Sequence, residues 1–100
     1  MKFDIRFTQS AADQIRAYRK FEQTRIFDAI ENQLRHDPTT DTRNRKRLSE
    51  NELADWELRV QNFCVFYDVV AEEGGQYIKV KAVGHKEHNK LFVAKKEVEL

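Results

Sequence analysis

The chain of 100 residues contains little cysteine, proline or glycine, and each shortage excludes a class of protein. Its single cysteine, Cys64, cannot form an internal disulfide, which excludes the small scaffolds that several disulfides hold together. One proline and three glycines exclude collagen-like and Pro/Gly-rich disordered chains. No apolar run approaches the roughly 20 residues that span a bilayer, and residues 1–10 lack the apolar segment of a signal peptide. We therefore expect one cytoplasmic domain over residues 1–100.

Charge is what the chain has in abundance, since 35% of its residues are charged and 40% are hydrophobic. The net charge of +1 hides two basic stretches, RNRKR at 43–47 and the lysines Lys79, Lys81, Lys86 and Lys90. If these stretches meet in the fold, they form a local patch that attracts a polyanion such as nucleic acid. A solvated loop and an ordinary charged strand edge explain the same residues equally well.

The first half of the sequence predicts a strand followed by two helices. Apolar and charged residues alternate over 2–7, as in a half-buried strand. A helix begins after Thr8 or Ser10, both of which are good N-cap residues. A second helical stripe, with Thr24 as its N-cap, stops before Pro38. We expect the apolar stripes of both helices to pack against a sheet.

A polar loop is predicted over 39–55, and an antiparallel hairpin follows it. Apolar and charged residues alternate over 56–60, and Gln61–Asn62 supplies a two-residue turn into a strand that runs directly back. This alternation places Arg59 and Cys64 on one face of the sheet, turned away from the helices.

The last predicted strand places Ile78, Val80 and Ala82 in the core and ends at Gly84. The glycine lets the following residues turn over the outer face of the hairpin. The segment 93–100 receives no assignment. The resulting order of elements, β-α-α-β-β-β, indicates an α+β domain with a largely antiparallel sheet.

This order, together with a basic loop and the segments WELRV, QN, FCVFYDV and VKAVGHKEHNKLF, resembles the RelE/ParE superfamily of type II toxin–antitoxin toxins. The resemblance covers essentially the whole chain and implies the RelE/ParE-like fold, with a cognate antitoxin as partner. RelE-like members are ribosome-dependent endoribonucleases that cut messenger RNA in the A site, whereas ParE-like members bind and poison DNA gyrase. The resemblance thus implies an mRNA-cleaving toxin that inhibits translation. A gyrase inhibitor without enzymatic activity and a catalytically weakened homologue are the alternatives.

Taken position by position, the resemblance to the family ribonucleases is partial. They usually carry basic residues on the first strand of the hairpin, where this chain has Glu57 and Arg59. They commonly have an arginine where this chain has Cys64, which weakens the case for a nuclease. A basic residue usually follows the closing glycine, and His85 and Lys86 match it.

A branch of the superfamily resembling YafQ has a histidine four residues before a terminal phenylalanine. His88 and Phe92 match that pattern, although the late aromatic residue is often tyrosine in other members.

Metal-free RNA cleavage needs a base, an acid and cations that stabilise the charged transition state. His85 and His88 are the candidate proton carriers, because the free histidine pKa of about 6.5 lies near neutrality. Arg59 and Lys86 are the candidates to hold the phosphate, and Phe92 to stack on a base. Glu57 is a candidate base, or it only orients Arg59. We expect these residues to converge beside the basic loop. The alternative is that His85 and His88 are ordinary surface residues and that Phe92 belongs to the core.

The remaining candidates for contact with RNA are the cations of the loop and of the last strand. They are Arg43, Arg45, Lys46, Arg47, Lys79 and Lys81. The ribosome and its messenger RNA are the expected targets, and neither a metal ion nor another cofactor is expected, because too few metal-binding residue types lie close together in the sequence.

Overall fold

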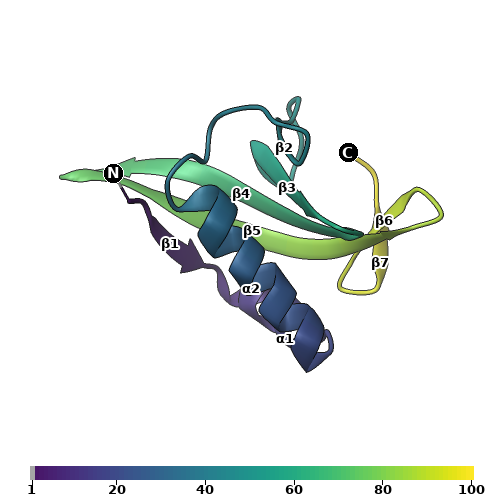
Figure 1. Ribbon diagram of the computed structural model, residues 1–100. Coiled ribbons are helices and arrows are strands. Elements are labelled where there is room, and N and C mark those ends of the chain that lie inside the picture. The colour runs from purple at the N-terminus through teal and green to yellow at the C-terminus, as the bar shows by residue number, and fades with distance from the viewer. Residues whose placement is uncertain (1) are drawn as a thin grey trace.

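The computed structural model describes residues 2–100, which form two helices and seven strands (Figure 1). In chain order they are β1 (Asp4–Phe7), α1 (Gln9–Arg16), α2 (Lys20–Leu34), β2 (Arg45–Arg47), β3 (Trp56–Val60), β4 (Phe63–Glu72), β5 (Gly75–Glu87), β6 (Lys90–Val93) and β7 (Lys96–Val98). No helix within this described part of the chain is long and apolar enough to cross a membrane.

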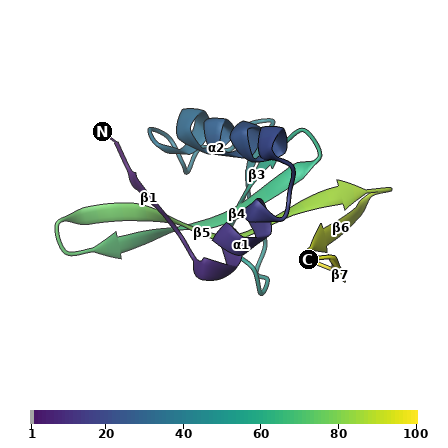
Figure 2. The same ribbon diagram turned by 90° about the horizontal axis from the view of Figure 1, so that it is seen from below.

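The seven strands form one curved sheet in which the neighbours run in the order β2-β3-β4-β5-β6-β7. All of these neighbours are antiparallel, whereas β1 pairs in parallel with the first half of β5. Both helices lie on the same side of the sheet, α1 against β5 and α2 against β3 (Figure 2). We call this side the helix face. The other side, which carries Glu57, Arg59, Cys64 and Phe66, is the far face.

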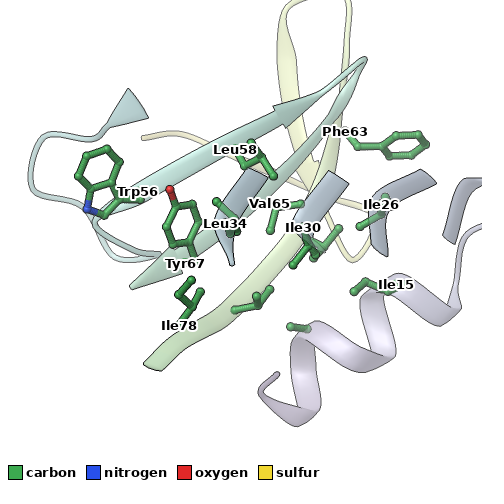
Figure 3. Close-up of a cluster of buried hydrophobic side chains, with 13 residues drawn as sticks. Ile15, Ile26, Ile30, Leu34, Trp56, Leu58, Phe63, Val65, Tyr67 and Ile78 are labelled. Carbon is green, nitrogen blue, oxygen red and sulfur yellow. The ribbon is translucent and has the colours of Figure 1, made fainter. Parts of the chain in front are cut away.

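The helix face buries the main hydrophobic core (Figure 3). Apolar residues of both helices, Ile15, Ile26, Ile30 and Leu34, pack on Trp56, Leu58, Phe63, Val65, Tyr67 and Ile78 of the sheet. A smaller cluster on the far face contains Phe66, Ala82, Leu91 and Val93. The sheet is therefore apolar on both sides over part of its area.

The two helices begin with different caps. Thr8 caps α1, as predicted, and its hydroxyl accepts a hydrogen bond from the Ala11 amide at 3.1 Å. The predicted cap Thr24 is wrong, because α2 already begins at Lys20 and the Glu22 carboxylate accepts a hydrogen bond from the Arg19 amide at 3.0 Å. This acidic residue in the first turn replaces the hydroxyl cap that the sequence suggested.

The hairpin between β3 and β4 has the predicted two-residue turn, in which Gln61 has a φ of 55°. The last predicted strand is longer than expected, because β5 does not end at Gly84 but continues to Glu87, and its final residues pair with β6. The segment predicted as a loop contains β2, and the unassigned C-terminal segment contains β7. The order β-α-α-β-β-β is therefore correct but incomplete.

A β-bulge in β5 changes which residues face the helices. Phe66 pairs with Ala82 and Tyr67 with Val80, so Lys81 has no partner on β4. Val80 and Val83 consequently both lie in the main core, and Ala82 packs into the far-face cluster. The prediction that Ala82 faces the helices is wrong for this reason, because one extra residue reverses the alternation beyond it.

Candidate active site

Three adjacent strands place a polar row on the far face. Arg59 of β3 lies opposite Cys64 of β4, and Cys64 lies opposite Gly84 of β5. Directly opposed residues of antiparallel strands share a face, so the prediction that Arg59 and Cys64 lie on one side is confirmed. Glu57, two residues before Arg59 on β3, lies on the same face of the sheet.

Glu57 and Arg59 form an ion pair that leaves part of each side chain unbonded. Arg59 Nη2 and Glu57 Oε2 are 3.6 Å apart. Two atoms, Glu57 Oε2 and Arg59 Nε, are buried and have no hydrogen-bond partner among residues 2–100. Buried polar atoms are nearly always bonded, so this pair has spare capacity for a ligand.

Cys64 is fully buried beside this pair. Burial, and then a hydrogen bond with Glu57, raise the pKa of the thiol to about 12, although Arg59 and Lys86 act in the opposite direction. The thiol is therefore protonated near neutrality and is no nucleophile. It can donate a hydrogen bond to the Glu57 carboxylate and hold it in place.

A cavity of about 270 Å³ opens next to the ion pair. It is lined by Arg43, Asn44 and Lys46 from the basic loop and by Glu57 and Arg59 from β3. The pairing of β2 with β3 creates this arrangement, because Lys46 lies opposite Glu57 in the ladder. Three cations and one carboxylate thus surround a space that is suited to a phosphate group.

Lys86 belongs to the same face. It pairs across β5 and β6 with Leu91 of the far-face cluster, and its charge acts on the Cys64 thiol. Gly84 makes this arrangement possible, since a Cβ there would overlap the carbonyl oxygen of Phe92 and would lie 2.8 Å from Cγ2 of Val93. Strand β6 therefore crosses closely over the far face at Gly84, and only glycine allows that approach.

His85 lies on the opposite side of the sheet. Its Nδ1 is 2.8 Å from the Tyr18 hydroxyl, and its ring stacks on Phe92 with centroids 5.7 Å apart. The expectation that His85 and Phe92 converge with Arg59 is therefore wrong. It assumed that the chain turns at Gly84, whereas β5 continues and consecutive residues of a strand point to opposite faces.

His88 lies outside the polar row as well. It is exposed and forms, with Asn89, the turn between β5 and β6, where both residues have positive φ values of 50° and 65°. It does not line the cavity beside Arg59. The structure thus brings Arg59 and Lys86 to one face and leaves His88 at a neighbouring turn.

Arg45 is not available to RNA, which corrects the prediction for this residue. Its side chain is buried, with 5% of its surface exposed, and donates hydrogen bonds to the carbonyls of Thr40 at 2.8 Å and Gln33 at 2.6 Å. Asp37 lies 3.6 Å from its guanidinium. Arg45 therefore fastens the loop to the C-terminal end of α2.

The other predicted cations lie in three places. Arg43 and Lys46 line the cavity, whereas Arg47 is exposed near the Trp56 ring, at 5.8 Å. Lys79 and Lys81 lie further along the sheet, outside the cavity lining, and Lys81 forms an ion pair with Asp68 at 3.2 Å.

The sequence offered Glu57 as a base or as a residue that only orients Arg59, and did not decide between the two roles. The sequence could not indicate that the Glu57 carboxylate is buried and that it contacts Cys64.

Within residues 2–100, no group of three or more His, Cys, Asp or Glu side chains lies close enough to hold a metal ion.

No model of a protein family matches the chain, and no curated protein does either. A search of solved structures finds a chain of the crystal structure of the toxin–antitoxin complex RelBE2 from Mycobacterium tuberculosis. The match has a TM-score of 0.66 at 16% sequence identity, and it covers 86% of this chain and all of the other. The chain therefore shares the fold of a chain of that toxin–antitoxin complex, and the predicted α+β, RelE/ParE-like fold is confirmed.

Proposed function

We propose that this protein is the toxin of a type II toxin–antitoxin pair and that it cuts messenger RNA on the ribosome. The fold is supported by the likeness to a chain from a toxin–antitoxin complex. The observation that carries the proposal is the pairing of a buried, incompletely bonded carboxylate with a guanidinium, Glu57 with Arg59, beside a cavity lined by further cations.

These groups match the needs of RNA cleavage without a metal. Glu57 would take the proton of a 2′-hydroxyl, whose oxygen then attacks the adjacent phosphorus. The bond from phosphorus to the 5′-oxygen breaks and leaves a 2′,3′-cyclic phosphate on the upstream fragment. Arg59 would bind the phosphate through bidentate hydrogen bonds, and the positive charge of Lys86 would stabilise the negative charge that develops in the transition state.

The leaving 5′-oxygen must receive a proton. His88, two residues beyond Lys86 and exposed to solvent, is the candidate for this step, in keeping with the sequence-based expectation. His85 is less suited, because its Nδ1 is engaged by Tyr18 on the other side of the sheet. Arg43 and Lys46 would bind flanking phosphates or ribosomal RNA, and their contribution would weaken as salt rises.

The test is cleavage of a defined messenger RNA on programmed ribosomes, with primer extension to map the cut. Wild-type protein should cut in the ribosomal A site, and Glu57→Gln should lose at least about tenfold in rate, since general bases usually contribute 10²–10⁴-fold. Lys20→Gln, a change on the exposed side of α2, serves as the control and should cleave normally. Intact messenger RNA, combined with inhibition of supercoiling by purified DNA gyrase, would overturn the proposal in favour of the gyrase alternative.

A further inference from the structure

A second cavity lies on the helix face, between the turn that joins α1 to α2 and the turn that joins β6 to β7. Its volume is about 380 Å³, larger than that of the cavity beside Arg59. Ala17 from the end of α1, Val83 from β5 and Ala94 from the β6–β7 turn contribute its apolar wall. Both turns lie at the same end of the molecule (Figure 1).

The polar groups in the wall of this cavity are already bonded to one another. Gln14 Oε1 accepts a hydrogen bond from the Val83 amide at 2.8 Å, and the Tyr18 hydroxyl lies 2.8 Å from His85 Nδ1. Burial raises the pKa of Tyr18 to about 12, so this hydroxyl remains neutral. A cavity with satisfied polar groups and apolar walls is suited to an apolar side chain rather than to a polar ligand.

The surroundings of the cavity are positively charged. Lys95 lies on its rim and Lys96 follows it, whereas Arg19 ends the turn on the other side and Lys20 begins α2. None of these four cations forms an ion pair with another residue of the described range 2–100.

Three acidic residues lie nearby and offset these cations only in part. Asp13, in the cavity lining, pairs with Arg16, whereas Glu22 and Glu87 act with their charges on Tyr18. These three carboxylates face the four unpaired cations together with Arg16. The rim is therefore complementary to a ligand that carries negative charge beside its apolar group.

We propose that this cavity binds one large apolar side chain of an acidic peptide segment, and that the segment belongs to the antitoxin. The second part rests on the proposed function, whereas the first follows from the cavity and its rim. Because the cavity lies on the helix face, the bound side chain would not cover Arg59 on the far face. The cavity would be an anchor that holds the antitoxin while leaving the candidate active site to other parts of it.

The probe is the blocked peptide acetyl-EELEELEE-amide, titrated into isotopically labelled protein and followed by NMR. Amide shifts should concentrate at Ala17, Val83 and Ala94. Ala17→Phe, which fills the cavity, should weaken binding at least tenfold, and Lys95→Glu should weaken it several-fold. Lys2→Glu is the matched charge control, since it lies near the opposite end of α2, and it should bind like the wild type.

A peptide in which both leucines are replaced by serine should not bind, and this comparison does not depend on any variant of the protein. Equal affinity of the serine peptide, equal affinity of a folded Ala17→Phe protein, or shifts confined to Arg59 and Lys86 would each overturn the proposal. Messenger-RNA cleavage is measured on the same preparations. If the wild-type protein cleaves normally but does not bind the leucine peptide, the anchor alone is refuted; if it binds the peptide but does not cleave, the nuclease alone is refuted.

Discussion

The two faces of the sheet differ in how completely their buried polar groups are bonded. On the helix face, the Tyr67 hydroxyl donates to the carbonyl of Pro38 at 2.6 Å, and Arg45 donates to two backbone carbonyls. On the far face, Glu57 Oε2 and Arg59 Nε are buried without partners within the described residues. An unbonded buried group costs about 1–3 kcal/mol, so the far face gives up stability that the helix face retains.

Arg45 and Arg59 illustrate this difference between the two faces. They lie on adjacent strands, carry the same charge and were both candidates for contact with RNA. Arg45 is 5% exposed and holds the loop to α2, whereas the Arg59 side chain is 37% exposed and faces a cavity. A basic residue in a sequence therefore indicates a binding site only when its strand directs it away from the core.

Loss of the Arg59 guanidinium should give the largest effect. Arg59→Ala is expected to reduce messenger-RNA cleavage by about 10²–10³-fold, the usual consequence of losing one contact to the transition-state charge. Its free energy of unfolding should also fall, by about 1–3 kcal/mol, because the mostly buried Glu57 carboxylate loses its partner, so the cleavage rate is compared per folded molecule. His88→Ala, tested alongside, should lose at least about tenfold if this residue supplies the proton. Full activity in both variants would refute the assignment of the site.

Substitution of Gly84 should disrupt the far face by steric overlap. Gly84→Ala is expected to lower the free energy of unfolding by about 3 kcal/mol, because the new Cβ overlaps the backbone of Phe92. Urea denaturation measures the change. Gly74→Ala is the matched control: it has open space around it and a φ of 89°, so only about 1 kcal/mol should be lost. Equal losses would mean that β6 does not pack tightly on β5.

Arg45 should affect stability and not cleavage. Arg45→Met keeps much of the buried side-chain volume but leaves the carbonyls of Gln33 and Thr40 unbonded, at an expected cost of about 2 kcal/mol. The cleavage rate per folded molecule should stay within about twofold of the wild type. A large loss of cleavage in a fully folded Arg45→Met protein would contradict the distinction between the two arginines.

Ionisation of Cys64 should have no effect on stability near neutrality, and its effect should be visible only in alkali. Its pKa rises from the ordinary value of 9.0 to about 12 in the folded protein, so its contribution to stability is complete below pH 9. As pH rises from 9 toward 12, the unfolded thiol ionises first, and stability should fall by up to about 1.4 kcal/mol per pH unit. Cys64→Ala should flatten this part of the pH profile of unfolding. An unchanged slope would show that the thiol is not buried as described.

Much of the fold was predictable because it depends on local patterns. Alternation over 56–60 identified a strand, and Gln61–Asn62 identified the hairpin turn. The start of α1 was narrowed to Thr8 or Ser10, of which Thr8 is the cap. The candidate site was predictable only in part. Arg59 follows from strand alternation, but the placement of His85 required knowing that β5 continues beyond Gly84.

The sequence alone determined which residues alternate and where short turns occur, because backbone geometry and residue preferences act between near neighbours. Tertiary structure decided the bulge at Lys81, the burial of Arg45 and the separation of His85 from Arg59. Each of these depends on contacts between segments far apart in the chain, such as β4 with β5 or the basic loop with α2. The face on which a side chain works is fixed by the register of those contacts, which no local pattern specifies.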